Sequence, residues 1–167
     1  DRPVAVPDRF TILEDERLVI SPDQLYGNDV DAEGAQLFIV SVGDASGGTL
    51  RLNGNGINGT IHFDPGPDFH GTASFTYVVS DGVNEVTGTV IIRVAPLNDA
   101  PTTSPVVLDD VEEDGSLITT PGELLQNAAD AEDDALTVTG LSSSNGTVTP
   151  NGDGTWTLTA GQLAGLT

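Results

Sequence analysis

The sequence predicts an all-β fold with many turns, and three observations support this prediction. Apolar residues make up 37% of the chain and occur as short runs rich in Val, Ile and Leu, with Thr among them. The 20 Gly and 10 Pro residues separate these runs, which is typical of strands joined by turns. No stretch shows helical periodicity beyond a single turn. The chain is therefore expected to fold around an apolar core.

The strands expected in the first part of the chain follow from runs of β-branched and aromatic residues. They cover 3–6 with 10–13, then 18–20, 37–42, 49–52, 60–63, 72–79 and 86–94. Ser21 and Pro22 predict one helical turn over 21–25, because Ser caps helices and Pro suits the first helical position. Asn and Gly residues between 53 and 59 predict a hairpin connection. About seven strands in about 95 residues is the number found in an immunoglobulin-like sandwich.

An internal repeat divides the chain. Glu14-Asp15 aligns with Glu113-Asp114 at an offset of 113 − 14 = 99, and Leu, Asn, Asp and Glu residues downstream keep this offset. The alignment predicts two domains, residues 1–98 and 99–167. The second domain has no counterpart of 72–79 and 86–94, so we expect it to lack its last two strands. Those strands would then have been cut off or come from another chain.

The charge of the chain excludes several kinds of partner. With 5 basic and 26 acidic residues the net charge is −21, which argues against binding to nucleic acid or to anionic membranes. No apolar run approaches the roughly 20 residues that span a bilayer. The chain has no Cys, so thiol chemistry and zinc–thiolate sites are excluded. The acidity either serves solubility or attracts a divalent cation.

Oxygen ligands suited to calcium gather in four turns. Ca²⁺ takes six to eight oxygens from carboxylates, amides, backbone carbonyls and water. The four segments are 14–16, 28–34, 80–82 and 98–101. Asp, Asn and Gly are also frequent in turns for backbone reasons alone, so a purely structural role stays open. Asp109-Asp110 and Asp133-Asp134 are expected to be solvated surface.

Several motifs together carry a resemblance to a known family. They are Glu14-Asp15, Asn28-Asp29-Val30-Asp31 with Gly34 and Leu37, Pro67-Asp68-Phe69-His70-Gly71, the segment 75–82, and Asn98-Asp99-Ala100-Pro101. With them the chain resembles the bacterial cadherin-like tandem repeats of large secreted proteins and surface adhesins, such as the extender repeats of RTX-type adhesins. The resemblance implies Greek-key β-sandwich repeats in tandem, of the cadherin and immunoglobulin-like kind.

The resemblance also implies calcium sites where one repeat joins the next. Its implied ligands in this chain are Glu14 and Asp68 at the end of the first repeat, Asn98 and Asp99 in the linker, and Asp130 and Glu132 at the start of the second repeat. By the same resemblance Asp29, Asp31 and Asp81 would face a preceding repeat. Pro96 and Ala128 stand where the family pattern has acidic residues. We therefore expect one ion of weak affinity, with a Kd of roughly 10⁻⁴–10⁻³ M.

The expected function is structural: calcium-binding extender repeats of a bacterial secreted or cell-surface adhesin, not an enzyme. The expected partners are calcium and neighbouring repeats, with a protein or glycan bound through the parent protein. Two alternatives stay open: a sandwich module that binds a carbohydrate or protein, and an accessory domain of a secreted enzyme. No Gly-x-Ser-x-Gly motif or histidine pair supports hydrolase or zinc chemistry. Trp156 alternates with Thr155 and Thr157, which predicts a buried position in a strand.

Overall fold

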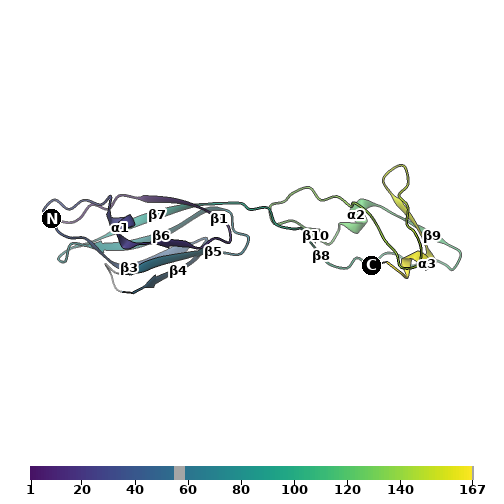
Figure 1. The fold of residues 1–167 in the computed structure, drawn as a ribbon, viewed down its shortest axis with the longest axis horizontal. Coiled ribbons are helices and arrows are strands. Elements are labelled where there is room, and N and C mark those ends of the chain that lie inside the picture. The colour runs from purple at the N-terminus through teal and green to yellow at the C-terminus, as the bar shows by residue number, and fades with distance from the viewer. Residues whose placement is uncertain (55–58, 167) are drawn as a thin grey trace. The chain divides into compact units, whose positions relative to one another are not determined.

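The computed structural model describes residues 1–54 and 59–166, so most of the predicted connection 53–59 lies outside the described residues. The chain divides into two compact units, unit 1 (Asp1–Leu97) and unit 2 (Asn98–Thr167). Each unit is described by itself below, and the elements carry the labels of Figure 1. No helix in the described part of the chain is long and apolar enough to cross a membrane.

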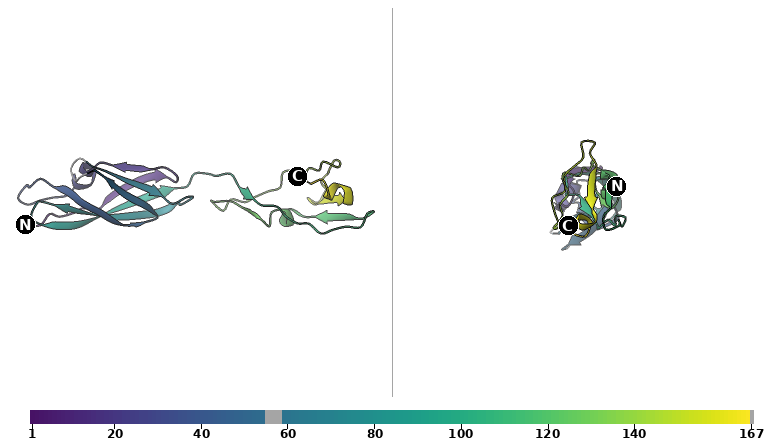
Figure 2. Two further views of the ribbon diagram at one scale, coloured as in Figure 1. Left: turned by 90° about the horizontal axis from the view of Figure 1, so that it is seen from below. Right: turned by 90° about the vertical axis from the view of Figure 1, so that its right-hand side faces the viewer.

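Unit 1 is an all-β sandwich, as predicted. Its elements are β1 (Asp8–Leu13), β2 (Leu18–Ile20), α1 (Pro22–Tyr26), β3 (Phe38–Ser46), β4 (Gly48–Asn53), β5 (Thr60–Pro65), β6 (Gly71–Ser80) and β7 (Glu85–Ala95). One sheet has the order β1-β7-β6-β3 and the other the order β2-β5-β4. The two sheets face each other in the left view of Figure 2. β1 runs parallel to β7, whereas the other pairs of neighbouring strands are antiparallel.

The core of unit 1 depends on the hairpin of β6 and β7. These two strands occupy the centre of the four-stranded sheet. Along both strands, buried residues alternate with half-buried or exposed ones, so one face of each strand is covered. Phe75, Tyr77 and Val79 point inward from β6, and Val90 and Ile92 do so from β7, with exposed fractions of 1% or less. Burial of each such side chain stabilises the fold by roughly 1.5–3 kcal/mol. The strongest strand patterns in the sequence therefore form the centre of the sandwich.

The first strand differs from the prediction at its start. The expected edge over 3–6 is not a strand but a single antiparallel bridge between Val4 and Val30, and β1 begins at Asp8. Pro3 and Pro7 flank this bridge and have no backbone N–H to donate, so a longer ladder cannot form there. The helical turn is confirmed as α1, which Ser21 precedes as the capping residue.

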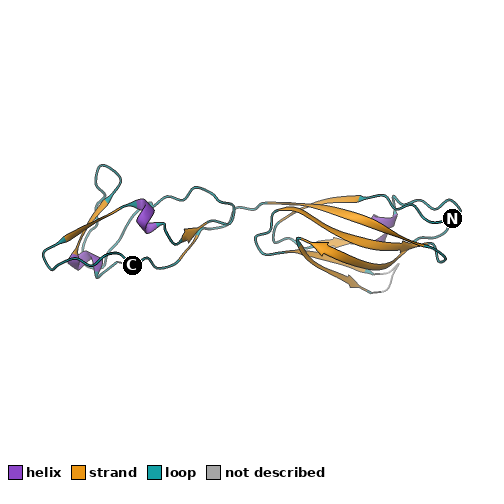
Figure 3. Cartoon of the chain, turned by 180° about the vertical axis from the view of Figure 1, so that it is seen from behind, coloured by secondary structure: helices purple, strands orange, loops and turns teal. Residues whose placement is uncertain are grey.

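Unit 2 contains short elements joined by long irregular segments (Figure 3). They are β8 (Thr102–Thr103), β9 (Ser116–Thr119), α2 (Pro121–Leu124), β10 (Ala128–Ala129), β11 (Trp156–Thr159) and α3 (Ala160–Leu163). β9 pairs with β11, and β8 pairs with β10. Trp156 is 6% exposed and Leu158 is fully buried, so the predicted buried position of Trp156 is confirmed.

Two strand pairings of unit 2 reproduce pairings of unit 1 with aligned residues. In unit 1, β2 pairs with β5 through Leu18 and Phe63. In unit 2, β9 pairs with β11 through their aligned counterparts Leu117 and Leu158. The Val4–Val30 bridge likewise corresponds to the pairing of Thr102 with Ala129. The internal repeat in the sequence is thus also a repeat of hydrogen-bond register.

A second shared feature is the capped helical turn. α2 lies 99 residues after α1, since 121 − 22 = 99. Thr120 caps α2 in a reciprocal arrangement, because its side chain accepts from the Glu123 N–H while its own N–H donates to the Glu123 carboxylate. Such a capping box satisfies two backbone donors that the helix leaves unpaired, which explains how so short a helix persists.

Candidate functional site

Acidic side chains cluster at the end of unit 1 that carries the N-terminus. Asp31 organises the turn that follows it, because its Oδ1 accepts from the N–H of Glu33 at 3.1 Å and from that of Ala35 at 2.8 Å. The Glu33 carboxylate, in turn, accepts from the backbone nitrogen of Asp1 at 2.8 Å. The turn thereby holds an Asp and a Glu carboxylate beside the first residue of the unit.

Unit 2 repeats this arrangement with the aligned residues. Asp130 Oδ1 accepts from the N–H of Glu132 at 3.2 Å and from that of Asp134 at 3.0 Å. The Glu132 carboxylate accepts from the N–H of Asp99 at 3.0 Å. A carboxylate oxygen of Asp99 lies within 4.8 Å of one of Glu132, which is close enough for both to bind one cation. Asp99, Asp130 and Glu132, all predicted ligands, are therefore brought together within unit 2.

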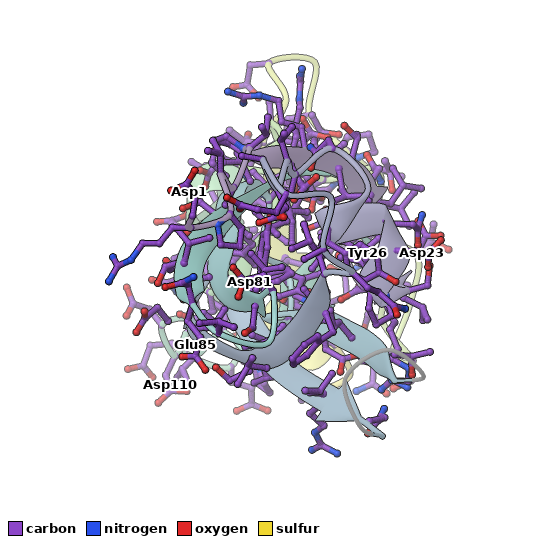
Figure 4. All side chains as sticks on the ribbon, turned by 90° about the vertical axis from the view of Figure 1, so that its left-hand side faces the viewer. Asp1, Asp23, Tyr26, Asp81, Glu85 and Asp110 are labelled. Atoms are coloured by element: carbon purple, nitrogen blue, oxygen red, sulfur yellow. The ribbon has the colours of Figure 1, made fainter. Side chains whose placement is uncertain are left out.

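Asp81 contributes a third carboxylate at the same end of unit 1, at the tip of the β6–β7 hairpin. Its Oδ1 accepts from the N–H groups of Val83 and Asn84 at 2.7 and 2.6 Å. The hydrogen bond from the N–H of Asn84, followed by that from Val83, lowers the pKa of Asp81, so the side chain stays ionised. Asp1 and Asp81 are both labelled in Figure 4, which views this end of the chain.

Asp29, which was predicted to join Asp31 and Asp81, is instead used by the sandwich itself. Its Oδ1 accepts from the N–H of Val6 at 2.7 Å, and both its carboxylate oxygens accept from the Tyr77 hydroxyl, at 3.1 and 3.2 Å. Within residues 1–54 and 59–166, Asp29, Asp31 and Asp81 do not form a group whose carboxylate oxygens all lie within 4.8 Å of one another. The role of Asp29 as a ligand stays a prediction.

The opposite end of unit 1 carries a second set of carboxylates. Glu14 directly follows β1, and its side chain is 1% exposed. Its Oε1 accepts from the N–H of Leu97. Its Oε2 has no hydrogen bond and lies 3.7 Å from His70 Nδ1. Carboxylate oxygens of Asp15 and Asp68 lie within 4.8 Å of each other. Glu14 and Asp68 were predicted ligands, and unit 1 thus places both at the end from which the chain leaves it.

Three of these acids were not among the predicted ligands. Asp15 follows Glu14, and its carboxylate lies close to that of Asp68. Glu33 is the aligned counterpart of Glu132, and Asp1 is the counterpart of Asp99 at an offset of 98. The repeat alignment contains the signal for Glu33 and Asp1. Asn98, a predicted ligand, donates from its side-chain amide to the carbonyl of Asp99 at 3.0 Å.

Comparison with known protein families covers almost the whole chain. A model of the family described as Bacterial Ig domain matches residues 1–93, and a model described as Cadherin-like domain matches residues 97–162. No curated protein matches the chain. The predicted resemblance to bacterial cadherin-like repeats is confirmed by these matches, as is the prediction of a sandwich fold.

Solved structures similar to the chain include endo-fucoidan hydrolases of glycoside hydrolase family 107. For the enzyme MfFcnA4 the identity is 20% and the TM-score 0.36, with 94% of this chain and 23% of that chain covered. For MfFcnA9 the values are 18% and 0.37, with 93% and 28% covered. The chain thus spans about a quarter of the length of these hydrolases. Because the Bacterial Ig domain model matches more than half of its residues, the chain belongs to the bacterial Ig domain family.

Proposed function

We propose that the chain is a non-catalytic structural segment of a bacterial extracellular or cell-surface protein, in which calcium stiffens the joints between sandwich domains. The observation that carries the proposal is the repeated turn at the start of each unit. Asp31, Glu33 and Asp1 in unit 1 have the same hydrogen bonds as Asp130, Glu132 and Asp99 in unit 2. A carboxylate arrangement that recurs at one end of successive domains suits a role repeated at every joint.

The second support comes from the end of unit 1 that precedes the linker. Leu97 is tied to the Glu14 carboxylate, and Asp99 follows only two residues later. Two peptide units span at most about 7.6 Å between Cα atoms, whatever the orientation of the units. The carboxylates of Glu14, Asp15 and Asp68 in unit 1 therefore precede a linker of only a few residues.

The physical benefit of calcium at such a joint is electrostatic. The chain carries a net charge of −21, and like charges on both sides of a short linker repel one another. A shared Ca²⁺ removes this repulsion and restricts bending, because both sets of carboxylates must then face one ion. Extender repeats of a surface adhesin need this stiffness, which is the role we propose.

The experiment is a thermal unfolding series in chelator and in added calcium. At a calcium concentration about tenfold above a Kd of roughly 10⁻³ M, binding to the folded state alone adds about 1.4 kcal/mol of stability. We expect the melting temperature to rise with calcium but not with an equal concentration of Na⁺. If the melting temperature is still unchanged when the calcium concentration is raised about another tenfold, the proposal of a calcium site is wrong.

Matched variants locate the site. Asp99→Ala should weaken calcium binding, measured by titration calorimetry, more than Asp110→Ala, which changes an acid that we expect to be solvated. Glu132→Gln keeps an oxygen for the N–H of Asp99 while it removes the charge, so its effect isolates the electrostatic contribution. Equal calcium affinities in the Asp99→Ala and Asp110→Ala variants would show that the linker is not the site.

A further inference from the structure

Basic residues are unevenly distributed along the chain. All five are arginines, and all of them lie in unit 1, whereas unit 2 has none. Arg17 pairs with Asp64 at 2.6 Å. Two of the other four, Arg9 in β1 and Arg93 in β7, belong to the same sheet, and both are exposed. Part of the positive charge of this acidic chain is therefore gathered on one sheet of unit 1.

The strand register makes these two arginines neighbours. β1 runs parallel to β7, with Arg9 opposite Ile91 and Thr11 opposite Arg93, so Arg9 and Arg93 are diagonal to each other. Neighbouring strands lie about 4.8 Å apart and alternate residues of one strand about 6.6 Å apart, which gives roughly 8 Å between the two Cα atoms. Two guanidinium groups on long side chains at this spacing are able to contact one ligand.

Hydroxyl groups flank the two arginines on the same face. β7 also pairs with β6, where Thr72 is opposite Arg93 and Ser74 is opposite Ile91. The three strands β1, β7 and β6 are labelled in Figure 1. Along all three, the residues between these positions are more deeply buried, so these positions lie on the outer face of the sheet. We call this surface the arginine patch; it consists of Arg9, Thr11, Thr72, Ser74, Ile91 and Arg93.

The polar groups of the arginine patch are available to a ligand. Within residues 1–54 and 59–166, the side chains of Arg9 and Arg93 form no ion pair or hydrogen bond, and neither do the hydroxyls of Thr11, Thr72 and Ser74. The patch itself contains no carboxylate, and the carboxylate clusters described above lie at the two ends of unit 1. Exposed charges more than about 8–10 Å away are largely screened at physiological salt. The patch therefore favours an anion locally, although the chain as a whole is acidic.

The chemistry of the patch distinguishes among anionic partners. Protein interfaces are anchored by aromatic and large apolar side chains, whereas Ile91, the apolar member of the patch, is already half-buried. Nucleic acids and anionic membranes require more positive charge than two arginines supply. A guanidinium donates paired hydrogen bonds to an oxyanion, and a hydroxyl both donates and accepts. A polymer that carries anionic groups and many hydroxyls satisfies both kinds of side chain.

We propose that the arginine patch is a binding surface for an anionic polysaccharide. The carboxylate or sulfate groups of the polymer accept hydrogen bonds from Arg9 and Arg93, and its hydroxyls exchange hydrogen bonds with Thr11, Thr72 and Ser74. The polymer lies across β1, β7 and β6 on the outer face of the sheet. Since unit 2 has no arginine, the surface is confined to unit 1. The binding needs no calcium, so its test is independent of the calcium site proposed above.

The experiment compares three polymers with one backbone: neutral dextran, carboxymethyl dextran and dextran sulfate. Affinities are measured by biolayer interferometry at low and at physiological salt, in chelator, so that calcium cannot bridge protein carboxylates to the polymer. The test variant is Arg9→Gln/Arg93→Gln, which keeps two hydrogen-bonding side chains and removes both charges. The control is Arg51→Gln, which removes an exposed arginine from β4 in the other sheet. Thermal unfolding verifies that both variants are folded like the parent.

We expect the chain to bind an anionic dextran and not the neutral one, more tightly at low salt, and the preferred polymer identifies the anionic group. The double variant should bind about tenfold more weakly, because each arginine contributes a charge-assisted hydrogen bond, whereas Arg51→Gln should change the affinity by no more than about twofold.

Three results would overturn the proposal. The first is no binding to either anionic dextran. The second is an affinity that is equal in the parent and the double variant, or that falls as far in Arg51→Gln as in the double variant, because binding would then not depend on the patch. The third is a doubled mass in light scattering that the double variant loses, because a second copy of the chain would then occupy the patch.

Discussion

Asp8 gives the most quantitative prediction about unit 1. The residue is 6% exposed, its Oδ1 accepts from the Asn28 side-chain amide at 2.9 Å, and its buried Oδ2 has no hydrogen bond. Burial raises the pKa of Asp8 from 3.8 to about 6, against the opposing effect of the hydrogen bond from Asn28 and of the nearby Tyr77 hydroxyl. The nearby charge of Asp29 raises it further. The folded state therefore holds the proton of Asp8 more tightly than the unfolded state does.

The sign of the pH dependence follows from this shift. Between about pH 4 and pH 6 the unfolded chain loses the Asp8 proton while the folded chain retains it, so the free energy of unfolding falls as pH rises. A shift of about 2 pKa units at 1.36 kcal/mol per unit gives a loss of about 3 kcal/mol, complete above pH 6. Asp8→Asn removes the ionisation and keeps an oxygen that accepts from Asn28. We expect the variant to be about 2–3 kcal/mol more stable than the parent at pH 7 and equal to it near pH 4.

The assay is urea unfolding at pH 4, 5, 6 and 7 in chelator and constant salt. Trp156 is the only Trp and lies in unit 2, so unit 1 is followed through the fluorescence of Tyr26 and Tyr77. The difference between variant and parent isolates Asp8, because the other carboxyl groups titrate in both proteins. Asp110→Asn serves as the control and should show no trend with pH. A difference between Asp8→Asn and the parent that stays constant from pH 4 to pH 7 would refute the reasoning.

Two further predictions concern packing. Gly88→Ala places a Cβ within 2.5 Å of the Tyr77 hydroxyl, so it should displace the tyrosine whose hydroxyl donates to Asp29. In urea unfolding, the free energy of unfolding of unit 1 should fall by about 1–3 kcal/mol. Gly140→Ala, where no atom lies within 4 Å of the new Cβ, is the control. Leu158→Ala should cost about 2–5 kcal/mol of stability in unit 2, because Leu158 is fully buried. The loss should appear in the Trp156 transition and leave the tyrosine transition unchanged; a shift of both would contradict the independent core of unit 2.

The secondary structure was predictable where side chains alternate or where a turn requires particular residues. β6 and β7 were expected over 72–79 and 86–94 and are found over Gly71–Ser80 and Glu85–Ala95, because alternating β-branched and aromatic residues determine both faces of a strand. α1 followed from Ser21 and Pro22. The strand over 3–6 was not formed, because two prolines outweigh the apolar pattern there.

The candidate site was predictable only in part, since ligand positions depend on contacts between distant residues. Asp130 and Glu132 followed from the resemblance, and the structure places the Glu132 carboxylate beside Asp99. Asp29 did not join Asp31, because the hydroxyl of Tyr77, 48 residues away, binds its carboxylate. No local spacing reveals such a contact. Unit 2 has Ala128 at the position of Asp29, so its start carries the Asp130–Glu132 turn without this additional buried acid.

This difference separates two roles that acidic residues play within one repeat. Asp8 and Asp29 lie against Tyr77 inside the sandwich, where burial raises the pKa of both, so a proton relieves their charge. Asp31, Glu33 and Asp81 lie at the same end of unit 1. Hydrogen bonds from N–H groups to Asp31 and Asp81 orient the turn and the hairpin tip there, and those to Asp81 lower its pKa. We expect calcium to bind to the second set. Calcium should therefore leave the pH dependence of the Asp8→Asn difference unchanged, whereas a common site for both sets would make that difference depend on calcium.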